Sequence, residues 1–186
     1  MQGTFAAFLL CSQLDSAKDT ILFIDPGFPV QKMQCQVMGV EFAQFDVADH
    51  RAEKLGPKLE SYLKQGNICC IVYSNPNNPS WMCLTEQEIK TIGELATKYD
   101  TVVLEDLAYM TMDFRRDGLG IPFQPPYHVS VSHYTENYIM IISGSKIFSY
   151  AGERIAVACI SDKLAERQFH TLQERYNISR FGAVYA

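Results

Sequence analysis

The chain has 186 residues, of which 47% are hydrophobic and 20% are charged, and its formal net charge is −5 at pH 7. This length and composition predict one globular domain with a substantial core and exclude a disordered chain. Lys and Arg form no basic run, so the charge pattern argues against nucleic acid and against a membrane surface as partners.

Residues 1–15 lack the basic first segment of a signal peptide, and their apolar stretch is too short to span a membrane. We therefore expect a soluble, cytoplasmic protein. A helix is predicted to begin almost at Met1, near Gly3 and Thr4, with no element before it. This pattern predicts that the chain is a fragment of a longer protein.

Apolar runs with many β-branched residues recur along the chain and are predicted to be strands. They cover residues 20–25, 40–47, 68–74, 101–106, 138–143 and 155–161. Between the fourth and fifth runs, the proline-containing stretch 115–134 predicts an irregular excursion. Runs that are apolar on both faces are typical of strands in a buried parallel sheet.

Helical patterns separate several of these strands. They occupy residues 29–39, 56–66 and 85–100. Thr85 and Glu88 form the signature of a capping box at the start of the third helix. Strands that alternate with helices predict a three-layer α/β/α domain with a mostly parallel sheet.

The cysteines and histidines show no spacing that is typical of a metal site or a disulfide framework. No C-x-x-C pair occurs, and several cysteines lie inside apolar runs, which predicts reduced thiols in the core. The cysteines are Cys11, Cys35, Cys69, Cys70, Cys83 and Cys159. The histidines, which are scattered, are His50, His128, His133 and His170. We therefore expect no metal.

Polar side chains follow three of the predicted strands at the point where each strand ends. Asn78 follows the third strand. Asp106 ends the fourth strand and Tyr109 follows it, and Ser143 ends the fifth strand and Lys146 follows it. Because the carboxyl ends of parallel strands meet at one edge of a sheet, ligands bind there. An amide, a carboxylate, a phenol, a hydroxyl and an amine are therefore expected to lie together.

Two further features predict a phosphate site beside this edge. The helix start at Gly3 and Thr4 offers free backbone N–H groups and the positive end of a helix dipole. Arg154 follows Lys146 by eight residues. Pyridoxal phosphate needs a lysine for a Schiff base, an acid for its ring nitrogen, donors for its phenolic oxygen and a phosphate cup. The sequence therefore predicts pyridoxal 5'-phosphate as the cofactor.

The segments "SGSK" (143–146) and "FSYAGER" (148–154) resemble those of the fold-type I pyridoxal-phosphate enzymes, specifically the class I/II aminotransferases similar to aspartate aminotransferase. The resemblance covers nearly the whole chain. It implies that Lys146 forms the Schiff base with the cofactor and moves a proton during the reaction. It also implies that Asp106 pairs with the pyridinium nitrogen.

The same resemblance assigns the remaining site residues. Tyr109 and Asn78 would hydrogen-bond the phenolic oxygen of the cofactor, and Phe28 in "DPGFP" would stack on the pyridine ring. The phosphate cup would consist of Ser143, Arg154, Gly3 and Thr4.

Each residue of this set also has a purely structural explanation. A lysine after a strand is usually solvated, and an aspartate at a strand end often caps a helix. "NPNNP" is an ordinary turn signal, and Phe28 and Tyr109 are ordinary core residues when taken alone. Their joint occurrence, in this order and at strand ends, favours the cofactor site.

The sequence thus predicts that residues 1–186 are the large, cofactor-binding domain of a pyridoxal-phosphate-dependent aminotransferase, which transfers an amino group between an amino acid and a 2-keto acid. Two alternatives stay open: a pyridoxal-phosphate lyase that acts by elimination, and a truncated domain that binds the cofactor without turnover. The resemblance implies that an N-terminal segment and a C-terminal small domain are missing and that the intact protein is a homodimer. Arg180 matches no motif for the arginine that binds the substrate carboxylate.

Two positions depart from the family pattern. Ser80 and Trp81 follow Asn78-Pro79 where the family commonly has threonine and glycine, so the family pattern does not define the conformation of this loop. Ala156 stands where glycine is frequent, and we expect only a small effect on packing there.

Overall fold

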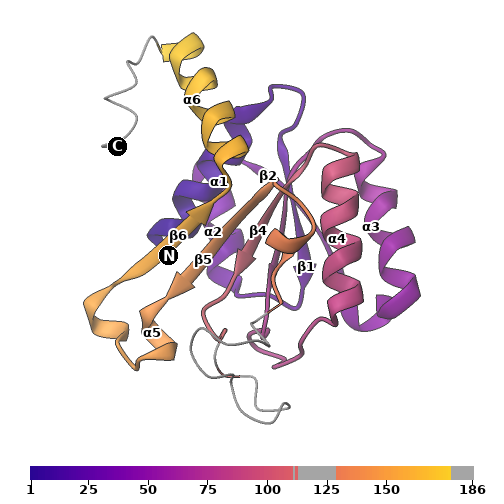
Figure 1. Cartoon of the computed structure of the whole chain (residues 1–186), viewed down its shortest axis with the longest axis vertical. Coiled ribbons are helices and arrows are strands. Elements are labelled where there is room, and N and C mark those ends of the chain that lie inside the picture. Colours follow the sequence, from indigo (N-terminus) through magenta and orange to yellow (C-terminus); the bar gives the residue numbers. More distant parts are fainter. Residues whose placement is uncertain (111, 113–128, 177–186) are drawn as a thin grey trace.

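A six-stranded sheet forms the centre of the molecule (Figure 1). The computed structural model describes residues 1–110, 112 and 129–176. The strand order is β2-β1-β3-β4-β5-β6, and all neighbours are parallel except β6, which runs antiparallel to β5. The strands are β1 (Thr20–Asp25), β2 (Glu41–Asp46), β3 (Ile68–Ser74), β4 (Val102–Asp106), β5 (Tyr138–Ser143) and β6 (Ala156–Ile160). The predicted mostly parallel sheet is confirmed.

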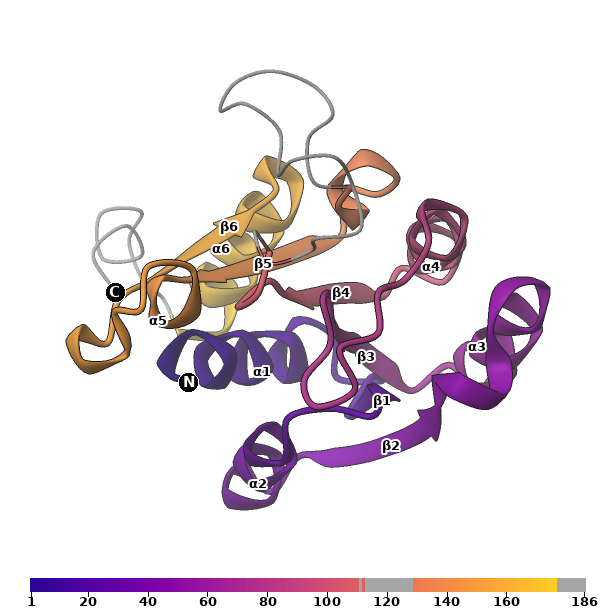
Figure 2. The same cartoon turned by 90° about the horizontal axis from the view of Figure 1, so that it is seen from below.

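Helices cover both faces of this sheet (Figure 2). One face carries α1 (Gln2–Leu14), α2 (Pro29–Met38) and α6 (Asp162–Tyr176). The other face carries α3 (Leu55–Leu63) and α4 (Glu86–Lys98). Short elements complete the described chain: α5 (Gly144–Ile147) and the 3₁₀ helices η1 (Val47–His50), η2 (Ala52–Lys54), η3 (Val131–His133) and η4 (Ala151–Glu153). The predicted three-layer α/β/α architecture is confirmed.

Successive residues of the central strands pack into two separate cores. In β4, Leu104 packs into the core beneath α1 and α2, whereas Val103 packs into the core beneath α3 and α4. Because side chains alternate along a strand, the next two residues also point in opposite directions. Glu105 therefore faces the layer of α4, and Asp106 faces the layer of α2.

The two outermost strands differ from the expectation that all strands are buried on both faces. In β6, Val157 is 57% exposed, and in β2 only Phe45 is buried. These strands lie at the margins of the sheet, where the helices cover them incompletely (Figure 1). Their apolar sequences therefore reflect membership of the sheet but not complete burial.

The capping box at the start of α4 is confirmed. Thr85 Oγ1 accepts a hydrogen bond from the Glu88 backbone N–H at 3.2 Å, and Glu88 Oε2 accepts one from the Thr85 backbone N–H at 2.8 Å. Arg51 also donates to the Glu88 carboxylate. Burial by itself raises the pKa of Glu88, but the hydrogen bonds from Arg51, Ala52 and Thr85 outweigh it and lower this pKa to about 2.

Five of the six cysteines are buried, and none forms a disulfide. Burial raises the pKa of Cys35 to about 11, so its thiol is neutral at physiological pH. Among the described residues, no cluster of three His, Cys, Asp or Glu side chains is arranged to hold a metal, and no helix is long and apolar enough to cross a membrane. Of the predicted excursion at 115–134, residues 115–128 lie outside the described residues.

Candidate active site

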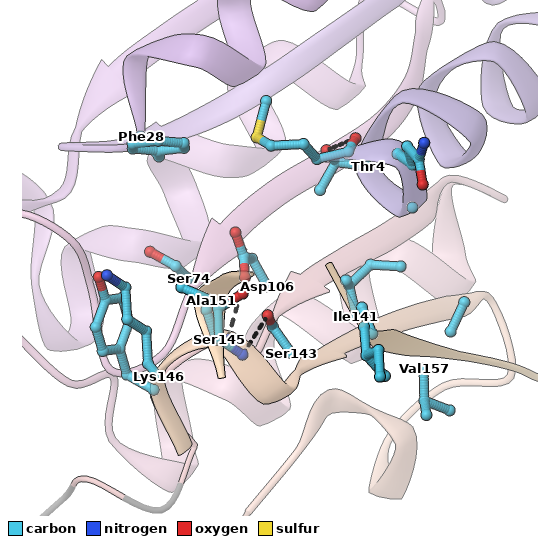
Figure 3. A pocket seen from close by; sticks show the side chains of 18 of the residues that line it. Thr4, Phe28, Ser74, Asp106, Ile141, Ser143, Ser145, Lys146, Ala151 and Val157 are labelled. Atoms are coloured by element: carbon cyan, nitrogen blue, oxygen red, sulfur yellow. Dashed lines mark hydrogen bonds between the residues drawn. The ribbon is translucent and has the colours of Figure 1, made fainter. Parts of the chain in front are cut away.

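The candidate site lies where the order of the strands reverses. The chain passes from β1 to β2 on one side and then returns to β3 on the other side of β1. Loops that follow the two strands at such a point diverge and leave a crevice at their carboxyl ends. A cavity of about 500 Å³ lies here, beside the first turn of α1 (Figure 3).

The structure places all nine predicted site residues around this one cavity. They come from the start of α1, from the carboxyl ends of β4 and β5, from the loops after β1, β3 and β4, and from the segment between β5 and β6. They are Gly3, Thr4, Phe28, Asn78, Asp106, Tyr109, Ser143, Lys146 and Arg154. Their chemical roles stay predictions, because location alone does not assign a function.

Asp106 provides a partly buried carboxylate at the end of β4. Its Oδ2 accepts a hydrogen bond from Gln31 Nε2 at 2.8 Å, and its Oδ1 accepts one from the Ala108 backbone N–H at 3.2 Å. Burial raises the pKa of Asp106, and these two hydrogen bonds counteract the rise only in part. A carboxylate in this position favours a cationic partner in the cavity.

Gln31 is a site residue that the sequence analysis missed. Its side chain is 4% exposed, it lines the cavity, and it holds the Asp106 carboxylate. A signal was present: residue 31 lies three positions after Phe28, in the first turn of a helix that begins beside the crevice. The hydrogen bond itself depends on how α2 packs against β4, which the sequence pattern does not show.

Lys146 lines the cavity as well. It lies in α5, directly after β5, and its side chain is exposed. In Figure 3, Phe28 lies above Lys146, and Asp106 lies to the right of both. Among the described residues, no carboxylate forms an ion pair with Lys146. An amine that is accessible and unpaired is available for reaction with an aldehyde.

Backbone contacts position the segment that carries Lys146. Ser143 caps α5, because its Oγ accepts a hydrogen bond from the Ser145 backbone N–H at 3.2 Å. The Gly144 backbone N–H donates to the carbonyl of Ile155 at 3.1 Å, which joins α5 to the start of β6. These contacts fix the segment that carries Lys146 to the end of β5 and to the start of β6.

The start of α1 forms a second polar region of the cavity. Met1, the N-cap residue, makes no side-chain hydrogen bond to the first turn, so no N-cap side chain satisfies the backbone N–H groups there. A Cβ on Gly3 would lie 3.2 Å from Ile141 Cδ1, so glycine lets the helix approach β5 closely. Arg154 also lines the cavity, and its Nη1 donates to the carbonyl of Ala151 at 2.7 Å. This region suits an anion.

Asn77, a second residue that the sequence analysis missed, fixes the loop that presents Asn78. Its side chain is 5% exposed, and its Nδ2 donates to the carbonyl of Pro26 at 2.5 Å. Ser80 donates from both its backbone N–H and its hydroxyl to Asn77 Oδ1. The loops after β1 and β3 are thereby tied together at the crevice.

The family of the chain follows from comparison with known proteins. All of residues 1–186 match the family described as aminotransferase class I and II. The chain belongs to this family. It is 31% identical to a histidinol-phosphate aminotransferase of Ruminiclostridium cellulolyticum over 87% of this chain and 41% of that protein. It is 26% identical to a probable N-acetyl-LL-diaminopimelate aminotransferase of Bacillus subtilis over 88% of this chain and 39% of that protein. The chain thus spans about two fifths of the length of these relatives.

Solved structures share the fold. An aspartate aminotransferase double mutant of Thermus thermophilus matches 97% of this chain and 45% of its own, with a TM-score of 0.69 and 16% identity. A pyridoxal-phosphate-bound C-S lyase of Staphylococcus hominis matches 92% of this chain and 42% of its own, with a TM-score of 0.67 and 18% identity. At these identities the likeness establishes only the fold of the chain. Its membership of the class I and II aminotransferases rests on the family match.

Proposed function

We propose that the chain is the cofactor-binding domain of a pyridoxal-phosphate-dependent aminotransferase that transfers an amino group between an amino acid and a 2-keto acid. The observation that carries this proposal is that one cavity is lined by both Lys146, whose side chain is accessible, and Asp106, whose carboxylate is partly buried. An aldehyde cofactor with a basic ring nitrogen needs both groups.

The residues of the cavity fit pyridoxal phosphate at both of its ends. The phosphate would lie at the first turn of α1, near Gly3 and Thr4, with Ser143 and Arg154 as further donors. The ring nitrogen would lie at Asp106, where burial strengthens the attraction between carboxylate and cation. Bound pyridoxal phosphate supplies a sink for the electrons released at the α-carbon of an amino acid.

The chain's own residues would bind, orient and transfer protons. Lys146 Nζ would hold the cofactor and then carry a proton to and from the reacting carbon. Phe28 would cover one face of the ring, and Tyr109 and Asn78 would donate hydrogen bonds to its phenolic oxygen. Each of the residues to which we assign these roles lines the cavity.

The wider context of the reaction belongs to the same proposal. We infer that the protein works in the cytoplasm as a homodimer, with an amino acid and a 2-keto acid as its small-molecule partners. A pyridoxal-phosphate lyase would use the same cofactor residues. The named aminotransferase relatives favour amino transfer over elimination.

The experiment that tests this function is an absorption titration of the purified chain with pyridoxal phosphate. We expect a visible band that saturates with the cofactor, and borohydride should fix one cofactor per chain on the peptide that contains Lys146. Peptide mass mapping identifies the modified lysine. A chain without a saturable band, or with label spread over several lysines, would contradict the proposal.

Replacement of Gln31 by leucine is expected to weaken pyridoxal phosphate binding about tenfold, because a hydrogen bond to a charged group contributes roughly 1.5 kcal/mol or more. The loss of this donor also raises the pKa of Asp106 further. When the pH is lowered, the affinity of the variant for pyridoxal phosphate should therefore begin to fall at a higher pH than that of the unaltered chain. The absorption titration, repeated between pH 5 and pH 8, measures both effects.

Gln36→Leu is the matched control for this change, because Gln36 lies on the exposed side of the same helix. We expect its affinity for pyridoxal phosphate to equal that of the unaltered chain. Equal losses in Gln31→Leu and Gln36→Leu would mean that Gln31 does not act through Asp106.

A further inference from the structure

Trp81 has a backbone conformation that bulky residues rarely adopt. Its φ is +59°, in the left-handed region, and a glycine would adopt it without strain. Trp81 is also the only tryptophan of the chain. The sequence therefore keeps its largest side chain at a position where the backbone favours the smallest residue.

Burial does not account for the choice of tryptophan, because 45% of Trp81 is exposed. Its ring instead packs edge to face against the ring of Tyr109, with a centroid distance of 5.5 Å and an interplanar angle of 74°. Tyr109 lies beyond the end of β4, in a turn, and lines the cavity. Because Tyr109 lies outside β4, the strand does not fix the orientation of its ring. The contact with Trp81 restricts that orientation.

The loop that carries Trp81 is well suited to give such support. The Trp81 backbone N–H donates to the carbonyl of Asn77 at 2.9 Å, and the side chain of Asn77 holds the loop after β1 through Pro26. These hydrogen bonds fix the backbone of Trp81 beside the crevice, and the indole is attached to this fixed backbone. A ring that is held in this way limits the positions open to its neighbour.

We propose that Trp81 is a positioning residue that orients the phenol of Tyr109 toward the cofactor. This inference rests on the proposed function, because Tyr109 is assigned there to the phenolic oxygen of pyridoxal phosphate. A hydrogen bond to that oxygen depends on the angle of the tyrosine ring. Trp81 acts on the cofactor only through this ring, since it does not itself line the cavity.

The decisive variant is Trp81→Gly, which removes the indole and leaves a residue suited to the positive φ. We expect it to bind pyridoxal phosphate about threefold to tenfold more weakly than the unaltered chain. The pH midpoint of the visible band of the bound cofactor should shift toward that of a Tyr109→Phe chain. Trp81→Phe, which keeps an aromatic edge against Tyr109, should restore most of the affinity.

Ala52→Gly is the matched control for relief of backbone strain. Ala52 has a φ of +55° but does not line the cavity. Both glycine variants should unfold at the same or a higher urea concentration than the unaltered chain. Only Trp81→Gly should change the affinity for the cofactor, so a stability effect and a positioning effect are separated.

A double-mutant cycle shows whether Trp81 acts through Tyr109. In the Tyr109→Phe background, Trp81→Gly should change the affinity by less than twofold, because the hydroxyl that it orients is gone. A full loss in that background would overturn the inference. An unchanged affinity and pH midpoint in Trp81→Gly alone would overturn it as well, with the proposed function intact. A missing band in the unaltered chain would overturn both.

Discussion

Lys146→Ala is expected to abolish the fixation of pyridoxal phosphate by borohydride, from one label per chain to none. Reduction fixes only a cofactor that is covalently attached to an amine, and Lys146 is the single lysine among the described residues that line the cavity. Asp106, Ser143 and Arg154 remain in the variant, so weaker, noncovalent binding should persist. Equilibrium dialysis measures this residual binding, and mass spectrometry measures the label.

The matched control is Lys163→Ala, because Lys163 is an exposed lysine in the first turn of α6 and does not line the cavity. This variant should be labelled at Lys146 to the same extent as the unaltered chain. Full labelling of the Lys146→Ala chain at another lysine would show that the cavity does not select the amine. The role of Lys146 would then be purely structural.

Much of this site could be predicted from the sequence because it depends on chain order and strand direction. In a parallel sheet, the residues that follow each strand meet at one edge, wherever the helices pack. Asn78, Asp106 and Lys146 each lie at or beyond the end of a different strand, and the structure places all three around one cavity. The capping box of Thr85 and Glu88 was predictable for a similar reason, since both partners lie within one turn of helix.

What could not be predicted depends on packing between elements that are distant in sequence. The hydrogen bond from Gln31 to Asp106 requires α2 to lie against the end of β4, 75 residues later. The contact of Trp81 with Tyr109 requires two loops to meet, and Trp81 breaks the usual link between a positive φ and glycine. A periodic pattern describes one element at a time and therefore misses such contacts.

The neighbour of Asp106 on β4 is the most deeply buried acid of the described chain. Glu105 is fully buried, and its carboxylate accepts hydrogen bonds from the Tyr73 hydroxyl at 3.0 Å and from the Ser130 hydroxyl at 2.5 Å. The backbone N–H of Val131 donates a third, at 3.3 Å. Burial nevertheless dominates and raises the pKa of Glu105 to about 7.

This raised pKa sets the sign of a pH effect on stability. The folded chain binds the proton of Glu105 up to about pH 7, whereas an unfolded chain releases it near pH 4.3. Glu105 makes its full contribution to the free energy of unfolding below its pKa in the unfolded chain. This contribution, on the order of 3 kcal/mol, is lost as the pH rises toward 7. Glu88, with a pKa of about 2, loses its contribution to stability only below pH 4.5, so it does not affect the dependence of stability on pH above that value.

Glu105→Gln should therefore flatten the dependence of stability on pH. The free energy of unfolding, measured in urea at pH 5 and at pH 8, should fall less in this variant than in the unaltered chain, by about 3 kcal/mol. Some decline should remain, because burial also raises the pKa of Asp106. Glu94→Gln, at a side chain that is 60% exposed, should keep the full decline.

An identical decline in Glu105→Gln and in the unaltered chain would mean that Glu105 is ionised throughout this range. The cavity would then lie beside two adjacent negative charges on β4, one on each face of the sheet. With Glu105 protonated, Asp106 alone carries charge at the end of the strand. Its attraction for a cation in the cavity is then set by its own burial and by Gln31, and the acid behind it only ties β4 to β3 and η3.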